Sequence, residues 1–179
     1  MAANQPPWPR QWLMTDERLG ERLWDAVGRL PAGAGIIFRH YSLGKADRFE
    51  LGLELARRAS ARNLVLGVAG NRHLADRLGA ALVHNPDEPG TLPSSLAVHD
   101  EAEARAARKS GSALAFIAPV HATRSHPGRS ALGIDRAVDL AALAGCPAIA
   151  LGGMNQSRFR AIEQRGFHGY AGIDCWLKT

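Results

Sequence analysis

Eight short apolar segments, separated by stretches of helical character, constrain the fold of this chain more than any other feature. The segments predict strands at residues 11–14, 35–39, 63–69, 80–84, 95–99, 113–119, 147–153 and 169–173. Nearly every residue in them is apolar, which is expected of strands covered on both faces, and alternation with helices favours parallel pairing through right-handed crossovers. The pattern predicts the α/β class and a single small (β/α)8 barrel, with an open doubly wound sheet as the alternative.

The connections between these segments are mostly helical in pattern. Helices are predicted at residues 16–29, 46–61, 72–78, 100–110, 134–144 and 155–164, and Asp100 and Asn155 are suitable N-caps. The fourth connection, residues 85–93, contains three prolines, which exclude a normal helix. Only residues 174–179 follow the last strand, so the final helix is expected to be truncated to at most one turn.

Length and composition set the domain organisation. Residues 11–179 are long enough for one barrel domain, and the three prolines within residues 1–10 predict an extended, poorly ordered N-terminal arm. No apolar run approaches the roughly 20 residues of a membrane span, and the N-terminus lacks the apolar core of a signal peptide. We therefore expect a cytoplasmic protein without a membrane partner, whose two cysteines, Cys146 and Cys175, are reduced.

The net charge of +5 raises the question of nucleic-acid binding. The basic residues are mainly arginines scattered among acids along the predicted helices, and no basic block is interleaved with aromatic residues. Solvated helix faces explain most of this charge, so no nucleic-acid partner is expected. The sequence leaves homo-oligomerisation open.

The polar residues that follow the predicted strands outline the rim from which site residues are expected, because active sites of parallel barrels lie at the carboxyl ends of the strands. These residues are Thr15, Asp16, Arg39, His40, Tyr41, Asn71, Arg72, His84, Asn85, His99, the segment 121–126, Gly152, Gly153 and Asp174. A glycine pair before a helix N-terminus lets the backbone approach an anion closely. Together with Thr123 and Ser125, Gly152 and Gly153 predict a phosphate or carboxylate site; close strand-to-helix packing is the structural alternative for the pair.

Five motifs in order, WLMTDERL, IIFRHY, AALVHNPDE, LAVHDEAEARAARKSGSALAFIAPVHATRSHPG and PAIALGGMN, resemble those of the thiamine phosphate synthase superfamily, which includes thiazole tautomerases. The resemblance implies a (β/α)8 barrel and a small phosphorylated thiazole or pyrimidine metabolite as partner. For synthase members it implies thiamine biosynthesis: an aminopyrimidine diphosphate is joined to a thiazole phosphate and pyrophosphate is released. That reaction requires Mg²⁺ to neutralise the leaving diphosphate.

The residues that would serve a diphosphate and its Mg²⁺ depart from the family pattern. Arg39 matches the diphosphate-binding arginine, but Tyr41 replaces a lysine. Asn71, which precedes Arg72, replaces a carboxylate metal ligand, which leaves Asp87 or Glu88 to supply the other acidic ligand, with Asp87 as the candidate for Mg²⁺. The resemblance thus implies a Mg²⁺ cofactor only if the chain is a synthase.

The residues matched to the phosphate end also depart from the pattern. Thr123 is kept, Ser125 is a hydroxyl replacement, and His126 replaces a lysine. Asp174 stands where the family has a phosphate-binding serine, and a like charge there disfavours phosphate. The alternative for Asp174 is a helix N-cap that faces away from the pocket.

His99 stands at the position of a histidine in the family pattern, and the resemblance to tautomerase members implies that it transfers protons. His84 ends the preceding strand. An imidazole can take and return a proton near neutral pH without a metal. Three hypotheses follow: a thiamine phosphate synthase-like enzyme with a departed site, a metal-independent thiazole tautomerase or isomerase using His99, and a non-catalytic binder of a small anionic metabolite.

Overall fold

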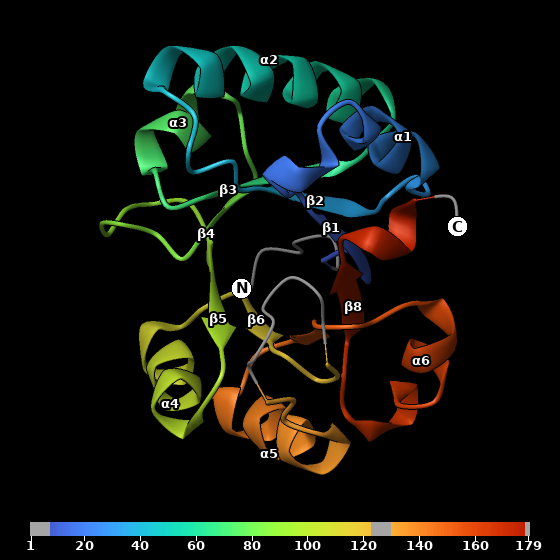
Figure 1. Ribbon diagram of the computed structural model, residues 1–179. Helices are drawn as coiled ribbons and strands as arrows, with labels where there is room; N and C mark the ends of the chain where they lie inside the picture. The colour runs from blue at the N-terminus through green and yellow to red at the C-terminus, as the bar shows by residue number, and fades with distance from the viewer. Residues whose placement is uncertain (1–7, 123–129, 178–179) are drawn as a thin grey trace.

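The chain folds into a closed barrel of eight parallel strands that pair in chain order (Figure 1). The computed structural model describes residues 8–122 and 130–177. The strands are β1 (Gln11–Met14), β2 (Gly35–Phe38), β3 (Val65–Ala69), β4 (Leu82–His84), β5 (Ser94–Val98), β6 (Leu114–Ile117), β7 (Ala148–Ala150) and β8 (Gly169–Gly172). Strand β1 pairs with β8, with Trp12 opposite Ala171, so the predicted (β/α)8 barrel is confirmed and the open sheet is wrong.

Helices surround the barrel, as Figure 1 shows. They are α1 (Arg22–Arg29), α2 (Lys45–Ala61), α3 (Arg72–Arg77), α4 (Glu101–Ser110), α5 (Ile134–Ala144) and α6 (Gln156–Arg160), with 3-10 turns η1 (Glu17–Leu19), η2 (Glu163–Arg165) and η3 (Asp174–Trp176). Asp100 and Asn155 cap α4 and α6 through their side chains, as predicted. The proline-rich connection between β4 and β5 has no helix, and the final helix is the single turn η3.

Two predicted helices were wrong in extent. The helix expected at 16–29 divides into η1 and α1 because Asp16 caps the first turn and Gly20, with φ of 49°, interrupts the helical path. The helix expected at 155–164 divides into α6 and η2 at Ile162, whose φ of −121° departs from helical geometry. Ile162 is fully buried, so the bend places an apolar side chain in the core.

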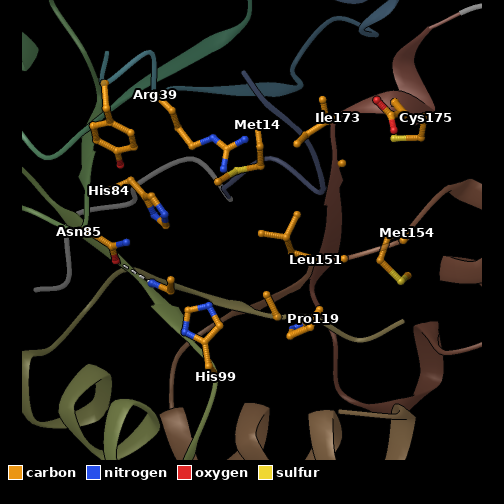
Figure 2. A pocket seen from close by; sticks show the side chains of 17 residues that line it. Met14, Arg39, His84, Asn85, His99, Pro119, Leu151, Met154, Ile173 and Cys175 are labelled. Atoms are coloured by element: carbon orange, nitrogen blue, oxygen red, sulfur yellow. Dashed lines mark hydrogen bonds between the residues drawn. The ribbon is translucent and has the colours of Figure 1, made fainter. Parts of the chain in front are cut away.

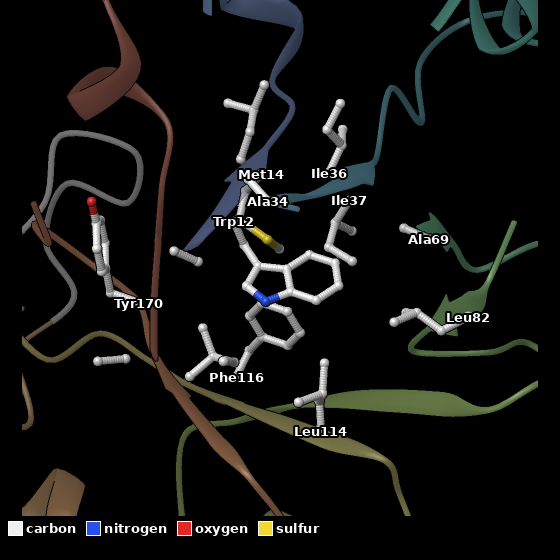
Figure 3. Packing of buried hydrophobic residues seen from close by; sticks show 14 of the residues in the cluster. Trp12, Met14, Ala34, Ile36, Ile37, Ala69, Leu82, Leu114, Phe116 and Tyr170 are labelled. Atoms are coloured by element: carbon white, nitrogen blue, oxygen red, sulfur yellow. The ribbon is translucent and has the colours of Figure 1, made fainter. Parts of the chain in front are cut away.

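Trp12 fills the interior of the barrel (Figure 3). Its ring meets the edge of Phe116 at 5.7 Å between centroids, and its Nε1 donates to the Pro9 carbonyl at 2.7 Å. A Cβ on Gly35 of the neighbouring strand would lie 2.2 Å from the indole, so only glycine fits there. Burying an aromatic side chain of about 200 Å² contributes on the order of 5 kcal/mol. Trp12 and Phe116 therefore form a solid layer, and the open space lies beyond it, at the carboxyl ends of the strands.

The two ends of the described chain pack beside the β1–β8 seam. Arg10 accepts a hydrogen bond from the Tyr170 N–H at 2.8 Å, and His168 Nε2 lies 2.6 Å from the Trp8 carbonyl. At the other end, Trp176 stacks on Tyr170 and donates from Nε1 to the Trp12 carbonyl at 3.1 Å. Trp176 therefore takes part of the place of a longer final helix. Over the described ranges, no helix has the length and apolar character needed to cross a bilayer.

Candidate functional site

A pocket of about 260 Å³ opens at the carboxyl ends of the barrel strands (Figure 2). Its lining includes these predicted site residues: Arg39, Tyr41, His84, His99, Gly152, Gly153 and Asp174. They come from β2, β4, β5, β7 and β8 and the loops that follow them, so closure of the barrel brings them together.

Three predicted site residues do not line this pocket. Asn71 caps α3, with its Oδ1 accepting from the Leu74 N–H at 2.7 Å. Arg72 turns into the β4–β5 loop, where its guanidinium donates to two backbone carbonyls. Asp87 is exposed, outside the pocket lining. Thr123, Ser125 and His126 lie outside the described residues.

Few carboxylates lie at the described rim, where the resemblance implies a magnesium site. Asp174 is the one carboxylate in the described lining of the pocket, and Asn71 is committed to its helix. In residues 8–122 and 130–177, no group of three or more His, Cys, Asp or Glu side chains is arranged to hold a metal ion. Mg²⁺ prefers carboxylate oxygens. The described residues therefore form no preassembled site of three protein ligands for this ion.

Arg39 is fixed at the edge of the pocket by strand β1. Its backbone N–H and its Nε donate to Thr15, at 2.9 Å to Oγ1 and 2.7 Å to the carbonyl, and its Nη2 lies 3.3 Å from Asp16. Burial lowers the pKa of Arg39, while the Asp16 charge opposes that shift. Among the described residues, Nη1 makes no hydrogen bond. The Nη1 group is thus a cationic donor available to a ligand.

His84 is a neutral histidine in the floor of the pocket. The side chain is buried, its Nδ1 lies 3.0 Å from Ser95 Oγ, and its ring meets Phe116 edge-on. Burial lowers the pKa of His84 to about 3, and the positive charges of Arg39 and His99 add to the shift. At neutral pH, His84 is therefore a hydrogen-bonding group without charge.

His99 is held by a carboxylate from the following helix. Glu103, in the first turn of α4, receives hydrogen bonds from His99 Nδ1 at 2.8 Å and from the His99 backbone N–H at 2.6 Å, both at Oε2. A carboxylate oxygen accepts hydrogen bonds, so Nδ1 carries the proton in neutral His99. The lone pair of the imidazole is therefore on Nε2, and His99 lines the pocket with its side chain 32% exposed.

The glycine pair allows close packing against a neighbouring loop, and its backbone N–H groups have no hydrogen-bond acceptor among the described residues. Gly152 and Gly153 have φ values of 96° and 60°, and a Cβ on either would lie 2.7 Å from an atom of the loop after β6. Close packing therefore requires glycine at both positions. Within the described part of the chain, neither N–H donates a hydrogen bond. Arg158 donates to the Gly153 carbonyl, which adds positive charge that the sequence analysis missed.

Asp174 is the first residue of η3 and lines the pocket. The N-cap position of this turn is Ile173, so the N-cap alternative for Asp174 is wrong. Arg18 lies within electrostatic range: its pKa is raised chiefly by its hydrogen bond with Asp16 and further by the charges of Asp16 and Asp174. The negative charge of Asp174 is thus balanced in part by Arg18.

Several lining residues were not predicted as site residues. Met14, Leu151 and Ile173 form an apolar wall, in which Leu151 and Ile173 lie across the pocket from His84 and Asn85 and Met14 lies beside Arg39 (Figure 2). Asn85 had been noted only as a residue after a strand, and its Oδ1 accepts from the Ala97 N–H at 2.8 Å. The alternation of side chains along a strand could have located Met14, because it shares the inward face of β1 with Trp12. The pocket suits a small ligand with one polar side and one apolar side.

The family model described as thiamine monophosphate synthase (TMP-TENI) matches residues 13–175. The chain belongs to this family. A relative in Aquifex aeolicus (strain VF5), named "Putative thiamine-phosphate synthase 2", is 23% identical over 185 residues, covering 95% of this chain and 98% of that protein. The family membership confirms the resemblance seen in the five sequence motifs.

Solved structures agree with this family in fold. The thiamine phosphate pyrophosphorylase from Pyrococcus furiosus has a TM-score of 0.76 and is 20% identical, covering 92% of this chain and 85% of that chain. A 3-hexulose-6-phosphate synthase has a TM-score of 0.59 and is 14% identical, covering 91% and 89% of the two chains. At these identities the likeness supports the barrel fold and not a particular reaction.

Proposed function

We propose that this member of the family is a metal-independent tautomerase that moves a proton on a small anionic heterocycle of the thiazole type. The observation that carries the proposal is the contact between His99 Nδ1 and Glu103 Oε2 at 2.8 Å, at the wall of a pocket of suitable size. A histidine held in one tautomer by a carboxylate is a common general acid–base arrangement.

The proposed reaction is a proton transfer without net change in charge. The Nε2 lone pair of His99 takes a proton from one ligand atom, and the electron pair of the broken bond enters the π system of the heterocycle. The imidazolium then returns a proton to a second ligand atom. Glu103 stabilises the imidazolium between the two steps, and the reaction needs neither a metal nor an organic cofactor.

Ligand binding is assigned to the groups around His99. Arg39 Nη1 and the N–H groups of Gly152 and Gly153 supply donors for anionic oxygens, and the apolar wall packs against the ring of the ligand. We propose a phosphorylated thiazole of thiamine biosynthesis as the substrate, handled in the cytoplasm. The family membership supports this choice of metabolite.

The test is turnover of the non-aromatic tautomer of a phosphorylated thiazole, followed by ultraviolet absorbance in metal-free buffer. His99→Ala should lower the turnover rate by about 10²- to 10⁴-fold, the usual contribution of a general acid–base group. Glu103→Gln should cause a smaller loss, because a neutral amide stabilises the imidazolium less. His73→Ala is the matched control, since His73 is exposed and outside the pocket. Full activity in a folded His99→Ala protein would refute the proposal.

The synthase reaction is a second candidate, favoured by the family and by the position of Arg39 in the pocket. It is tested by release of pyrophosphate from the two phosphorylated precursors in the presence of Mg²⁺. Release at a rate that depends on Arg39 would favour the synthase. A rise in melting temperature with a ligand, without turnover in either assay, would favour the non-catalytic binder.

A further inference from the structure

Arg48, in the first turn of α2, contacts two residues of the pocket without lining the pocket itself. Its Nη2 donates to two backbone carbonyls, that of Arg39 at 3.0 Å and that of Ala69 at 2.8 Å. These carbonyls lie at the carboxyl ends of β2 and β3, the neighbouring strands beside which α2 lies (Figure 1). Arg48 therefore joins two strand ends at the rim of the pocket, and its guanidinium also meets the ring of Tyr41.

The position of Arg48 is unfavourable for a cation in two respects. A positive charge in the first turn of a helix opposes the helix dipole. Burial lowers the pKa of Arg48, and its Nε is buried without a hydrogen bond to any described residue. Contacts with the rings of Phe38 and Tyr41, whose centroids lie 5.7 Å and 5.4 Å from Cζ, offset part of this cost. The contacts with the strand ends and the rings, and not the stability of α2, therefore account for an arginine here.

The bond to the Arg39 carbonyl stabilises an unusual backbone conformation at the next residue. His40 has φ of 24°, where residues other than glycine are rarely found. The Arg39 carbonyl belongs to the peptide plane that precedes His40, so Arg48 fixes one side of this torsion. The His40 ring fixes the other side, because its Nδ1 lies 3.0 Å from Thr15 Oγ1. Strained conformations of this kind persist where the surrounding contacts determine them, and they are concentrated at functional sites.

The same bond completes the positioning of Arg39. The Arg39 backbone N–H donates to Thr15 Oγ1 at 2.9 Å, and its carbonyl accepts from Arg48. The peptide planes on both sides of the Arg39 Cα are thus held, which gives the Cα–Cβ bond one direction. The side chain follows this direction into the pocket, where Nη1 makes no hydrogen bond to any described residue (Figure 2). Loss of the Arg48 contact would release one of the two planes and change the orientation of the guanidinium.

We propose that Arg48 is a positioning residue of the pocket, which acts through Arg39 and keeps its guanidinium in the orientation that binds the anionic part of the ligand. The inference rests on the proposed function, in which Arg39 supplies a donor for anionic oxygens. Arg48 does not line the pocket, so its effect on ligand affinity is transmitted through the backbone of Arg39. A residue that acted only by its charge at a distance would change the affinity equally with and without Arg39.

The test is a double-mutant cycle of Arg48→Met and Arg39→Met, with inorganic phosphate as the probe and calorimetry as the measurement. Arg48→Met keeps an unbranched side chain and removes the charge and the donors. In the otherwise wild-type protein it should weaken phosphate binding by about tenfold, because a hydrogen bond between charged groups depends on its geometry. In the Arg39→Met background the same substitution should change the affinity by less than about twofold.

The matched control is Arg58→Met, which makes the same chemical change on the same helix. Arg58 lies over the ring of Trp24, with Cζ 4.2 Å from the centroid, outside the pocket lining, so phosphate affinity should stay at the wild-type value. Arg48→Lys keeps the charge and a donor and should recover the affinity to within about threefold of the wild type. If Arg48→Met fails to fold, Arg48→Lys takes its place in the cycle, and its smaller loss should again disappear in the Arg39→Met background.

A second readout needs no ligand. The chain contains two tyrosines, Tyr41 and the buried Tyr170, so labelling with 3-fluorotyrosine gives two fluorine resonances, which Tyr41→Phe assigns. Arg48→Met should move the Tyr41 resonance toward that of free fluorotyrosine, because the ring loses its contact with the guanidinium. The Tyr170 resonance should stay in place, as should both resonances in Arg58→Met.

Equal losses of phosphate affinity from Arg48→Met in the two backgrounds would overturn the inference, and so would a Tyr41 resonance that does not move. Failure of the wild-type protein to bind phosphate would overturn it too, because Arg39 would then not be an anion-binding residue. None of these results depends on turnover. The proposed function can therefore fail in the His99→Ala assay while the role of Arg48 stands, and the reverse outcome is equally distinguishable.

Discussion

At the residue scale, histidines of the pocket differ in role because their neighbours differ. His84 is buried against Phe116 with a serine hydroxyl as its partner, whereas His99 is partly exposed and bonded to a carboxylate. In the sequence both are histidines at the ends of apolar strands. The spacing of His99 and Glu103 is visible there, but helix i,i+4 pairs are common on solvated faces, so only the structure shows that this pair lies at a pocket.

The buried His84 makes stability depend on pH. Its pKa is about 3 in the folded protein and near 6.5 when unfolded, so the unfolded chain binds more protons between these values. The contribution of neutral His84 to the free energy of unfolding is fully present above pH 6.5 and is lost as the pH falls toward 3. From pH 7 to pH 5, the free energy of unfolding should decrease by about 2 kcal/mol through this residue.

Urea unfolding of the wild type and of His84→Gln at pH 7 and pH 5 measures this contribution. The variant should be less stable at pH 7 but should show a smaller loss on acidification. Some loss should remain, because burial also lowers the pKa of His40. Equal losses in the two proteins would contradict the assignment to His84.

At the element scale, the connection between β4 and β5 is stabilised by a side chain and not by a crossover helix. Arg72, nearly buried at the start of α3, reaches across and donates to the carbonyls of Glu88 at 2.9 Å and Leu92 at 3.2 Å. A Cβ on Gly90 would lie 2.2 Å from the Arg72 side chain, so the loop packs closely against this side chain at Gly90. Arg72 thus supplies contacts that a crossover helix would otherwise make.

Removal of this contact should destabilise the barrel. Arg72→Ala should lower the free energy of unfolding by about 3 kcal/mol, because two backbone carbonyls lose hydrogen bonds from a charged donor. Thermal unfolding followed by circular dichroism checks this value. The exposed Arg29→Ala on α1 is the control and should stay within about 0.5 kcal/mol of the wild type. A loss in Arg72→Ala no larger than in the control would show that the loop holds without the guanidinium.

The strands and helices were largely predictable from the sequence, whereas the roles of several site residues were not. The strands follow from apolar runs and the helix starts from Asp100 and Asn155, which are local signals. Asn71 and Arg72 were assigned to ligand binding because their residue types suit both tasks. The structure shows Asn71 as the cap of α3, bonded to the nearby Leu74, which is a local signal that was read as ligand binding. Arg72 instead contacts the β4–β5 loop, and its role depends on residues that lie 16 and 20 positions away in the sequence. The same holds for Asn85, whose orientation depends on a backbone N–H of the next strand.

At the scale of the whole molecule, the barrel depends on a close fit between Trp12 and Gly35. The Cβ of an alanine at position 35 would collide with the six-membered ring of the indole, which is buried and has no room to move. The neighbouring strands pair with Trp12 opposite Gly35, so the fit is part of the barrel register.

Gly35→Ala should therefore destabilise the protein by about 3 kcal/mol. In a Trp12→Phe background, where the fused ring is absent, the same substitution should cost less than half as much. The double-mutant cycle, measured by chemical denaturation, gives the coupling between the two residues. Additive effects would mean that the clash is relieved elsewhere in the barrel.

The bond from Trp176 Nε1 to the Trp12 carbonyl joins residues 164 positions apart and lies at the seam where β8 meets β1. During synthesis on the ribosome, β1 emerges before the other strands of the barrel, and one of its edges stays unpaired until β8 has been made. Closure of this barrel therefore waits for β8, and nascent chains arrested before β8 expose a sheet edge that chaperones or neighbouring chains can bind.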